Sequence, residues 1–226
     1  MTDTPADTPA DTPADPRDAI VDAYVRLDRE GLNRGSSGNV SVRDGVDGML
    51  ISPTGIDAAR ITAAGIVAMG IDGSARSDGI PSSEWQMHAE IYRAFPETKA
   101  VVHTHADACV AIACQRRGIP AFHYMVAGYG GNDIRCAPYE TFGSAALARA
   151  AVAALRDRTA CLLANHGMLA RGPDLKAAVN TTLKLETLAR QYWMTLQVGP
   201  PTLLSDAEMA EVLVRYRDYG RVRMQG

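Results

Sequence analysis

Short apolar runs alternate along this chain with longer segments of helical periodicity, and this alternation constrains the fold more than any other feature. Runs rich in apolar and β-branched side chains, bounded by glycine or polar residues, are typical of strands. Because strands and helices are interleaved over the whole chain, we expect one α/β domain. The predicted strands are Asn39–Arg43, Met49–Ser52, Ala100–His105 and Thr159–Ala164, the last of which resumes at Met168–Ala170.

The segments between the strands carry apolar residues at helical spacing. In the first of them Ile20, Tyr24 and Leu27 share one face, and a glycine ends the pattern. The last helix opens with a capping box, Ser205 and Glu208, in which each side chain accepts the other's backbone N–H. The predicted helices run from about Pro16 to Gly31, from Ser82–Ser83 to Phe95, near Ala108–Arg117, over Pro173–Gln197 and from Ser205 to Gly220.

The first fifteen residues differ from the rest of the chain. They hold three copies of Asp-Thr-Pro-Ala, which start at Asp3, Asp7 and Asp11. A proline at every fourth position, with acids and no large apolar group, cannot form a packed core. We therefore expect a disordered tail over residues 1–15 and a single domain over 16–226, which is long enough for a substantial core.

Composition and charge argue against several classes of partner. A net charge of −3 leaves no basic footprint for nucleic acid. No apolar run approaches the roughly 18–20 residues of a membrane span, and the start has no apolar signal core. The four cysteines form no C-x-x-C pair and predict reduced core residues of a cytoplasmic protein; they are Cys109, Cys114, Cys136 and Cys161.

Three histidines follow two of the predicted strands. His103 and His105 lie two apart at the end of a strand, so their rings project from the same face, about 6–7 Å apart at Cα. His166 follows the other strand in a turn before a glycine. Three histidines on two strand ends form the protein ligand set of a catalytic zinc site. The two other histidines, His88 and His123, lack ligand spacing, and for both a structural role is the favoured interpretation.

Glu84 and the hydroxyl groups before it stand at the predicted start of a helix. Ser83 is a natural N-cap, with Gln86 completing a capping box, and the same helix start with Ser82 suits a phosphate group. Glu84 in the first turn is either an ordinary acidic residue there or a group that reaches the metal and moves protons.

Two further turns suit an anion because they are small and polar. The first spans residues 35–39 and includes Gly38 and Asn39, and the second spans 52–55 and includes Thr54 and Gly55. Neither matches a P-loop. The chain has only three lysines, and none belongs to these motifs, so a lysine Schiff base is not expected to carry the chemistry.

Taken in order, these motifs resemble the class II aldolase/adducin family. The resemblance covers about residues 18–220 and, within the family, is strongest to the aldolases of fuculose 1-phosphate. It rests on five segments and the closing His166: residues 33–43, 52–55, 81–84, 101–105 and 119–143. Two positions depart from those aldolases: Tyr216 stands where they carry phenylalanine, and Asn165 where they carry histidine.

The resemblance implies a three-layer α/β/α sandwich on a largely antiparallel sheet and a homotetramer with active sites between subunits. It implies that Tyr124 reaches the neighbour's site as an acid/base group and that Tyr216 and Tyr219 help to close that site. Zinc would be held by His103, His105, His166 and Glu84, which is also catalytic, and the phosphate of a sugar phosphate by Gly38, Asn39, Thr54, Gly55, Ser82 and Ser83.

The implied reaction is cleavage of a deoxyketose 1-phosphate to dihydroxyacetone phosphate and a short aldehyde. Three alternatives stay open within the family. One is a pentulose-phosphate 4-epimerase, although such enzymes usually carry aspartate where this chain has Glu84. The others are a methylthioribulose-1-phosphate dehydratase and a non-catalytic, adducin-like scaffold, which the retained metal histidines disfavour.

Overall fold

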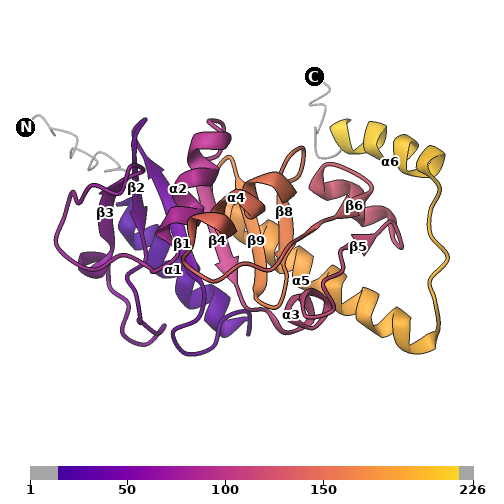
Figure 1. The fold of residues 1–226 in the computed structure, drawn as a ribbon, viewed down its shortest axis with the longest axis horizontal. Coiled ribbons are helices and arrows are strands. Elements are labelled where there is room, and N and C mark those ends of the chain that lie inside the picture. The colour runs from indigo at the N-terminus through magenta and orange to yellow at the C-terminus, as the bar shows by residue number, and fades with distance from the viewer. Residues whose placement is uncertain (1–14, 219–226) are drawn as a thin grey trace, which may run out of the picture.

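The computed structural model describes residues 15–218, in which strands and helices alternate along the chain (Figure 1). The strands are β1 (Asn39–Asp44), β2 (Gly48–Ile51), β3 (Val67–Gly70), β4 (Ala100–Thr104), β5 (Ile119–Pro120), β6 (Asp133–Ile134), β7 (Cys136–Ala137), β8 (Ala160–Leu163) and β9 (Gly167–Gly172). The helices are α1 (Pro16–Arg29), α2 (Trp85–Ala94), α3 (Asp107–Ala113), α4 (Ala145–Ala154), α5 (Leu175–Val198) and α6 (Asp206–Asp218), with 3-10 turns η1 (Ala63–Gly65) and η2 (Tyr124–Tyr129).

A sheet of seven strands in the order β3-β2-β1-β4-β9-β8-β7 forms the centre of the molecule. Every neighbouring pair in it is antiparallel except β7 and β8, which run parallel. Strands β5 and β6 form a separate pair, which lies with α6 at the far end of the molecule from β3 (Figure 1). In the central sheet β4 lies between β1 and β9, so the ends of these three strands can share one site.

Alternating side chains divide the core into two layers, one on each face of the sheet. On β4, Val102 packs into the layer that holds residues of α1, α3 and α5, while Val101 packs into the layer that holds residues of α2 and α4. This alternation follows from the period of two along a strand. Helices therefore cover both faces, and the predicted α/β/α sandwich with a largely antiparallel sheet is confirmed.

Several local predictions were wrong. Helix α2 begins at Trp85 with Glu84 at its N-cap position, so Ser83 is not the N-cap and no capping box forms with Gln86. Instead the hydroxyl of Ser82 accepts the backbone N–H of Glu84, at 3.3 Å. Strands β3, β5, β6 and β7 and helix α4 were missed, since four of these five are short and α4 is a run of small residues.

The cysteine prediction holds only in part. All four thiols are free, and Cys109 and Cys161 are buried as expected. Cys136 is half-buried and Cys114 is exposed, so Cys114 is not a core residue. None of the helices within residues 15–218 combines the length and apolar character needed to cross a bilayer.

The predictions for the two ends of the chain fall partly outside the residues that the structure describes. The side chain of Asp15 caps α1 by accepting the backbone N–H of Arg17 at 2.9 Å, while residues 1–14 lie outside the described part. At the other end the capping box of Ser205 and Glu208 is confirmed by reciprocal bonds of 2.7 and 3.3 Å. The predicted end at Gly220 lies outside the described residues.

Candidate metal centre and anion pocket

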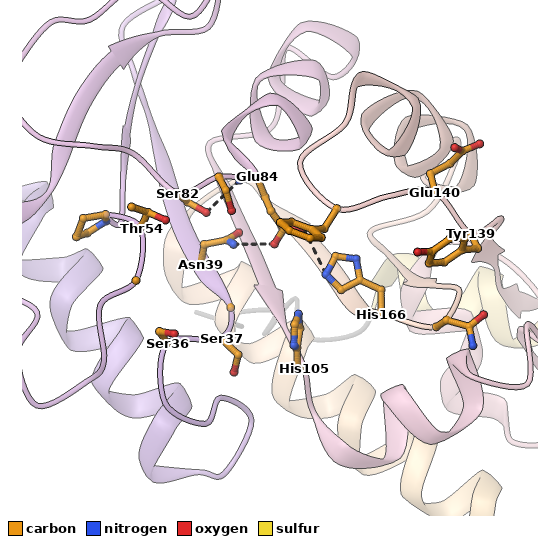
Figure 2. Close-up of a pocket in the computed structure, with 16 residues that line it drawn as sticks. Ser36, Ser37, Asn39, Thr54, Ser82, Glu84, His105, Tyr139, Glu140 and His166 are labelled. Atoms are coloured by element: carbon orange, nitrogen blue, oxygen red, sulfur yellow. Dashed lines mark hydrogen bonds and ion pairs between the residues drawn. The ribbon is translucent and has the colours of Figure 1, made fainter.

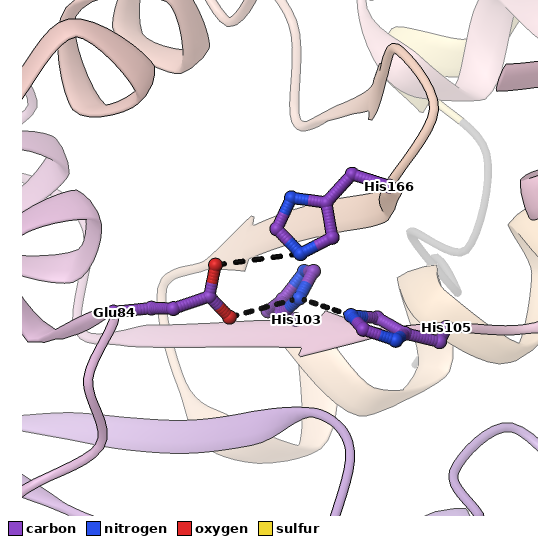
Figure 3. Close-up of side chains that lie close together, drawn as sticks. All are labelled: Glu84, His103, His105 and His166. Carbon is purple, nitrogen blue, oxygen red and sulfur yellow. Dashed lines mark hydrogen bonds and ion pairs between the residues drawn. The ribbon is translucent and has the colours of Figure 1, made fainter. Parts of the chain in front are cut away.

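Glu84 and three histidines converge at the end of β4 (Figure 3). His103 and His105 come from this strand and its extension, His166 from the turn between β8 and β9, and Glu84 from the start of α2. One ligand atom from each lies within 4.8 Å of all the others. The three imidazole rings meet edge to face, with centroids 4.8–4.9 Å apart, so their nitrogens point to a common centre.

The hydrogen bonds of His103 assign its protons. Its Nδ1 lies 2.8 Å from the carbonyl oxygen of Met168 and must donate to it, so in the neutral ring, which is the form that binds a metal, Nε2 carries the lone pair. That Nε2 faces Nε2 of His105 at 3.0 Å and a carboxylate oxygen of Glu84 at 3.1 Å. Buried nitrogens this close, with the lone pair of one turned toward the centre, form a donor set for a cation.

The carboxylate of Glu84 supports the same conclusion. The residue is 6% exposed, and its Oε1 accepts no hydrogen bond, although it lies 3.4 Å from Nε2 of His166. A buried, unsatisfied carboxylate oxygen is costly, and a bound divalent cation would satisfy it. The residues present therefore fit a metal ion with three imidazole ligands and one carboxylate.

Electrostatics place three of the four ligands, Glu84, His105 and His166, in the protonation state that a metal requires. Burial raises the pKa of Glu84, but the nearby His103 and His166 and the Asn39 amide outweigh it and hold the pKa well below its usual range. Burial, followed by the charge of His103, lowers the pKa of His105 and of His166 to about 4. For His103 burial lowers the pKa, yet Glu84 and the Met168 carbonyl shift it upward overall. At neutral pH the carboxylate is charged and two imidazoles are neutral.

Gly167 allows the rings to approach the turn that carries His166. A Cβ atom there would lie 2.5 Å from the carbonyl oxygen of Thr104 and against the rings of His105 and His103. The residue before His166, Asn165, has a φ of 54°, which asparagine tolerates better than most residues. Its side chain accepts a bond of 2.8 Å from Arg116, which fixes the turn.

The metal cluster opens into a pocket of about 320 Å³ (Figure 2). Thr54, Ser82 and Asn39 lie on one side of it, Tyr139 and Glu140 on the other, with the cluster between. The pocket brings together all six residues predicted to bind phosphate: Gly38, Asn39, Thr54, Gly55, Ser82 and Ser83.

Backbone hydrogen bonds hold the three anion loops side by side. Ser82 donates its N–H to Ser52 at 3.1 Å, and Thr54 donates to Ile80 at 3.1 Å. The Ser52 hydroxyl accepts the N–H of Val40 at 3.1 Å, which ties the second turn to β1. The first turn needs glycine at Gly38, because its φ is +77° and a Cβ would lie 2.2 Å from the Asn33 side chain.

Tyr124 does not lie in the pocket of its own chain. It stands in η2, is 52% exposed and does not line the pocket. Neighbouring His123 stacks on it, at 4.8 Å between ring centroids, and accepts the N–H of Met125. Tyr216 is half-buried against Gly128 in the same region, and Tyr219 lies outside the described residues.

The sequence did not predict the far side of the pocket or the setting of His88. Tyr139, Glu140 and Phe142 line the pocket, but no local pattern marks them as site residues. His88, interpreted as a helix-face residue, is fully buried between α2 and β1 and contacts Asn39. The signal for it was its position four residues, one helical turn, after Glu84.

Known proteins share this fold and align with most of the length of this chain. Residues 18–193 match the Class II Aldolase and Adducin N-terminal domain. The 5-methylthioribulose-1-phosphate/5-deoxyribulose-1-phosphate aldolase of Rhodospirillum rubrum is 48% identical over 204 residues, 90% of this chain and 92% of that protein. The L-fuculose phosphate aldolase of Escherichia coli K12 is 44% identical over 89% of this chain and 94% of that protein.

A solved structure agrees. An L-fuculose 1-phosphate aldolase superposes with a TM-score of 0.86 at 36% identity, covering 91% of this chain and 98% of the other. The chain therefore belongs to the class II aldolase and adducin family. Within that family it is an aldolase, a lyase of the group whose relatives are named for sugar phosphates.

Proposed function

We propose that this chain is a zinc-dependent aldolase that cleaves a deoxyketose 1-phosphate into dihydroxyacetone phosphate and a short aldehyde. The candidate substrates are 5-deoxyribulose 1-phosphate, 5-methylthioribulose 1-phosphate and L-fuculose 1-phosphate. One observation carries the proposal: a single pocket joins the anion loops to the cluster of Glu84, His103, His105 and His166. A 1-phosphate held by the loops places the adjacent ketose carbons beside that cluster.

Different residues of the chain bind the phosphate, hold the metal and transfer protons. Hydroxyls and amides of the three loops bind the phosphate and fix the orientation of the ketose. Zinc bound by the four ligands would supply a Lewis acid that polarises the ketose oxygens. A base removes the proton from the C4 hydroxyl, the C3–C4 bond breaks, and the electron pair stays on C3 while the aldehyde leaves. Glu84, which lies at the cluster and is ionised at neutral pH, then takes up a proton from water and delivers it to C3, while the base returns the C4 proton to solvent.

We assign the C4 proton to Tyr124 of a neighbouring subunit in a homotetramer. The exposed position of Tyr124 outside its own pocket supports this assignment, because an exposed side chain can reach another chain. On the far side of the pocket, Tyr139 and Phe142 are about half or more exposed and would face the aldehyde half. An apolar substrate end, such as a methyl or methylthio group, suits these rings.

The test of the reaction is a panel of substrates measured with zinc-loaded protein. We expect dihydroxyacetone phosphate, detected by its enzymatic reduction with NADH, from at least one of the three ketose 1-phosphates. Interconversion of pentulose 5-phosphates without cleavage would identify an epimerase instead. Loss of water from 5-methylthioribulose 1-phosphate would identify a dehydratase, and inactivity on the whole panel would favour a scaffold.

The test of the shared site mixes two inactive proteins, Tyr124→Phe and Glu84→Gln. If Glu84 and Tyr124 of one site come from different chains, some sites in mixed oligomers hold both intact residues and activity returns. If both come from one chain, every site stays damaged and mixing recovers nothing. Sizing of the same mixtures reports whether the protein is a tetramer.

A further inference from the structure

A chain of buried polar side chains runs from Glu84 into the interface between α2 and β1. On β1, Asn39 and Ser41 are two residues apart and face α2. On α2, His88 and Tyr92 lie one and two turns after Glu84 on the same face. All five residues are buried, with exposed fractions between 0% and 6%.

In this hydrogen-bonded network every donor points toward Glu84. The Asn39 amide nitrogen donates to Glu84 Oε2 at 3.1 Å, so its carbonyl oxygen faces Nε2 of His88 at 2.5 Å. An amide oxygen only accepts, so Nε2 of His88 must carry the proton and Nδ1 must accept. The hydroxyl of Ser41 donates to that Nδ1 at 2.7 Å, and Tyr92 donates to Ser41 at 2.8 Å.

The Glu84 carboxylate and the His88 N–H together fix which way the amide of Asn39 points. If the amide turned over, its oxygen would face the Glu84 carboxylate and its nitrogen would face the His88 N–H, so both contacts would become repulsive. Burial and the charge of His103 lower the pKa of His88 to about 3, so the ring carries a single proton at neutral pH. A neutral ring that accepts from Ser41 has its one proton on Nε2.

We propose that His88 is a positioning residue that acts through Asn39 to hold the Glu84 carboxylate toward the metal ligands. The proposal rests on the proposed role of Glu84 as metal ligand and proton carrier. Within the described residues, the Asn39 amide is the one group other than a histidine that bonds this carboxylate. Loss of a partner of this kind, one step removed from the metal, typically weakens metal affinity about 10–100-fold.

Tyr92, at the end of the network away from Glu84, provides a matched control. Tyr92→Phe removes a buried hydrogen bond to Ser41, but Ser41 still donates to His88, and the direction of the remaining bonds is kept. A network that serves only stability would make His88 and Tyr92 equivalent. A network that positions Glu84 makes His88 matter for the metal and Tyr92 matter only for stability.

The experiment measures Co²⁺ affinity of the metal-free protein, and kcat of the loaded enzyme, for His88→Phe, His88→Gln and Tyr92→Phe. We expect Co²⁺ binding about tenfold or more weaker, with reduced kcat, in His88→Phe. Glutamine can donate to Asn39 and accept from Ser41, so His88→Gln should restore most of both. Tyr92→Phe should lower the unfolding midpoint while affinity and kcat stay within about twofold. In an Asn39→Leu background, His88→Phe should cost nothing further.

Several results would overturn the inference: unchanged Co²⁺ affinity in folded His88→Phe, equal losses in the Gln and Phe variants, or equal losses in Tyr92→Phe. If His88→Phe does not fold, Ser41→Ala takes its place, since it frees His88 to adopt the other tautomer. Unchanged Co²⁺ affinity there would also refute the proposal. A wild-type protein that cleaves no ketose phosphate would refute the proposed function, while the Co²⁺ measurements would still decide the role of His88.

Discussion

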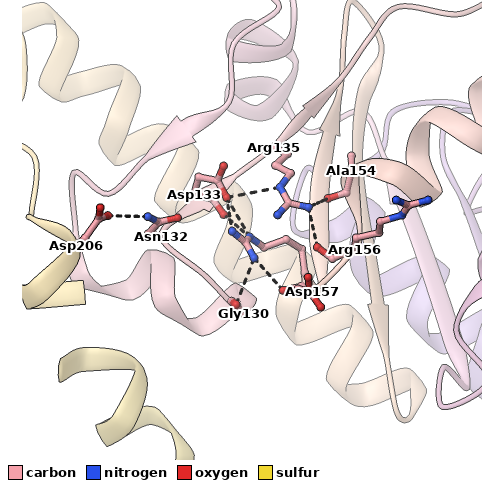
Figure 4. Close-up of polar contacts among 9 residues, drawn as sticks. Gly130, Asn132, Asp133, Arg135, Ala154, Arg156, Asp157 and Asp206 are labelled. Atoms are coloured by element: carbon pink, nitrogen blue, oxygen red, sulfur yellow. Dashed lines mark hydrogen bonds and ion pairs between the residues drawn. The ribbon is translucent and has the colours of Figure 1, made fainter. Parts of the chain in front are cut away.

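Two buried charges in this molecule have opposite surroundings. Arg158 is 7% exposed, and its guanidinium donates to the Asp133 carboxylate at 2.6 and 3.0 Å and to the carbonyl oxygens of Gly130 and Asp157 at 3.3 and 3.0 Å. Figure 4 labels these three partners. Glu84 is buried to the same extent, yet one of its oxygens accepts no hydrogen bond. Groups of the protein satisfy all the hydrogen-bonding nitrogens of the Arg158 guanidinium, but they do not satisfy both oxygens of the Glu84 carboxylate.

The difference separates a structural role from a ligand-binding one. Arg158 joins the segment of residues 130–133 to the turn before β8, and every nitrogen of its guanidinium has a partner, so the cluster needs nothing from outside. The carboxylate of Glu84 faces Nε2 of His103 and of His166, and a bound divalent cation would satisfy all these groups. Mutations in the two clusters should therefore affect different measurements.

The largest expected effect is that of His105→Ala. Removing one of three imidazoles should abolish tight metal binding and activity together, because the remaining ligands cannot complete the set. The fold should survive, since the core layers of the sheet do not include this side chain. Elemental analysis, activity and circular dichroism check this. His123→Ala is the control, because His123 lies outside the cluster, and it should retain the metal. Full activity of a metal-free His105→Ala protein would contradict the metal centre.

Arg158→Met should give the opposite result. It leaves the buried carbonyl oxygens without their donor and the partly exposed Asp133 carboxylate to be solvated by water, which costs about 1–3 kcal/mol in the free energy of unfolding. The kcat per folded, metal-loaded chain should not change. Denaturant unfolding and kinetics measure both. Arg135→Met, which alters a more exposed arginine near the same carboxylate, should cost about 1 kcal/mol or less. Equal costs would show that burial of the guanidinium is not decisive.

Glu84→Gln should lower kcat by roughly a hundredfold or more, the usual scale for an acid/base group. Stability should fall less than in Arg158→Met: the favourable charge of Glu84 beside His103 and His166 is lost, but the amide keeps an oxygen that can accept the Asn39 N–H. This is the reverse of the Arg158 pattern. Exchange of the C3 proton of dihydroxyacetone phosphate with solvent isolates the step, and exchange at the wild-type rate would exclude Glu84 from proton transfer.

Local sequence patterns predicted one α/β domain and the three histidines of the cluster, while the antiparallel sandwich and Glu84 as a ligand were implied by the family resemblance. Strand periodicity places His103 and His105 on one face, and β4 carries both to its end. The antiparallel pairing of β4 with β9 brings His166 beside them. The loops that hold Thr54 and Ser82 come together in the pocket, as the resemblance implied.

What the sequence missed depends on contacts between distant segments. Nothing near Arg158 marks it as buried, because its partners, Asp133 and Gly130, are 25 and 28 residues away. The role of Ser83 as N-cap was inferred from local chemistry, but the bridge between Pro53 and Pro81 holds the chain extended there and delays the helix to Trp85. The contact of His88 with Asn39 could not be predicted, because it depends on the packing of α2 on β1.

The smallest expected effect is a change in the pH dependence of stability of metal-free protein. His88 has a pKa lowered to about 3 in the folded protein, against about 6.5 for an unperturbed histidine. Below pH 6.5 the unfolded chain therefore takes up a proton that the folded chain excludes, so stability is fully present above this pH and falls on acidification. His105 and His166, with pKa values lowered to about 4, act in the same direction.

Replacing His88 by glutamine removes one of the groups that take up a proton only in the unfolded chain. Between pH 6 and pH 5, metal-free His88→Gln protein should lose less stability than wild type, by at most about 1.4 kcal/mol per pH unit. Urea unfolding in chelator at pH 5, 6 and 8 measures the two slopes, and above pH 7 the two proteins should run parallel. Glu84, His103 and Tyr92 surround His88 and are present in both proteins, so their own titration cancels in the difference to first order. Equal slopes between pH 6 and 5 would mean that His88 takes up its proton in the folded state. The one-way chain of hydrogen bonds from Tyr92 to Glu84 would then not hold in solution at that pH.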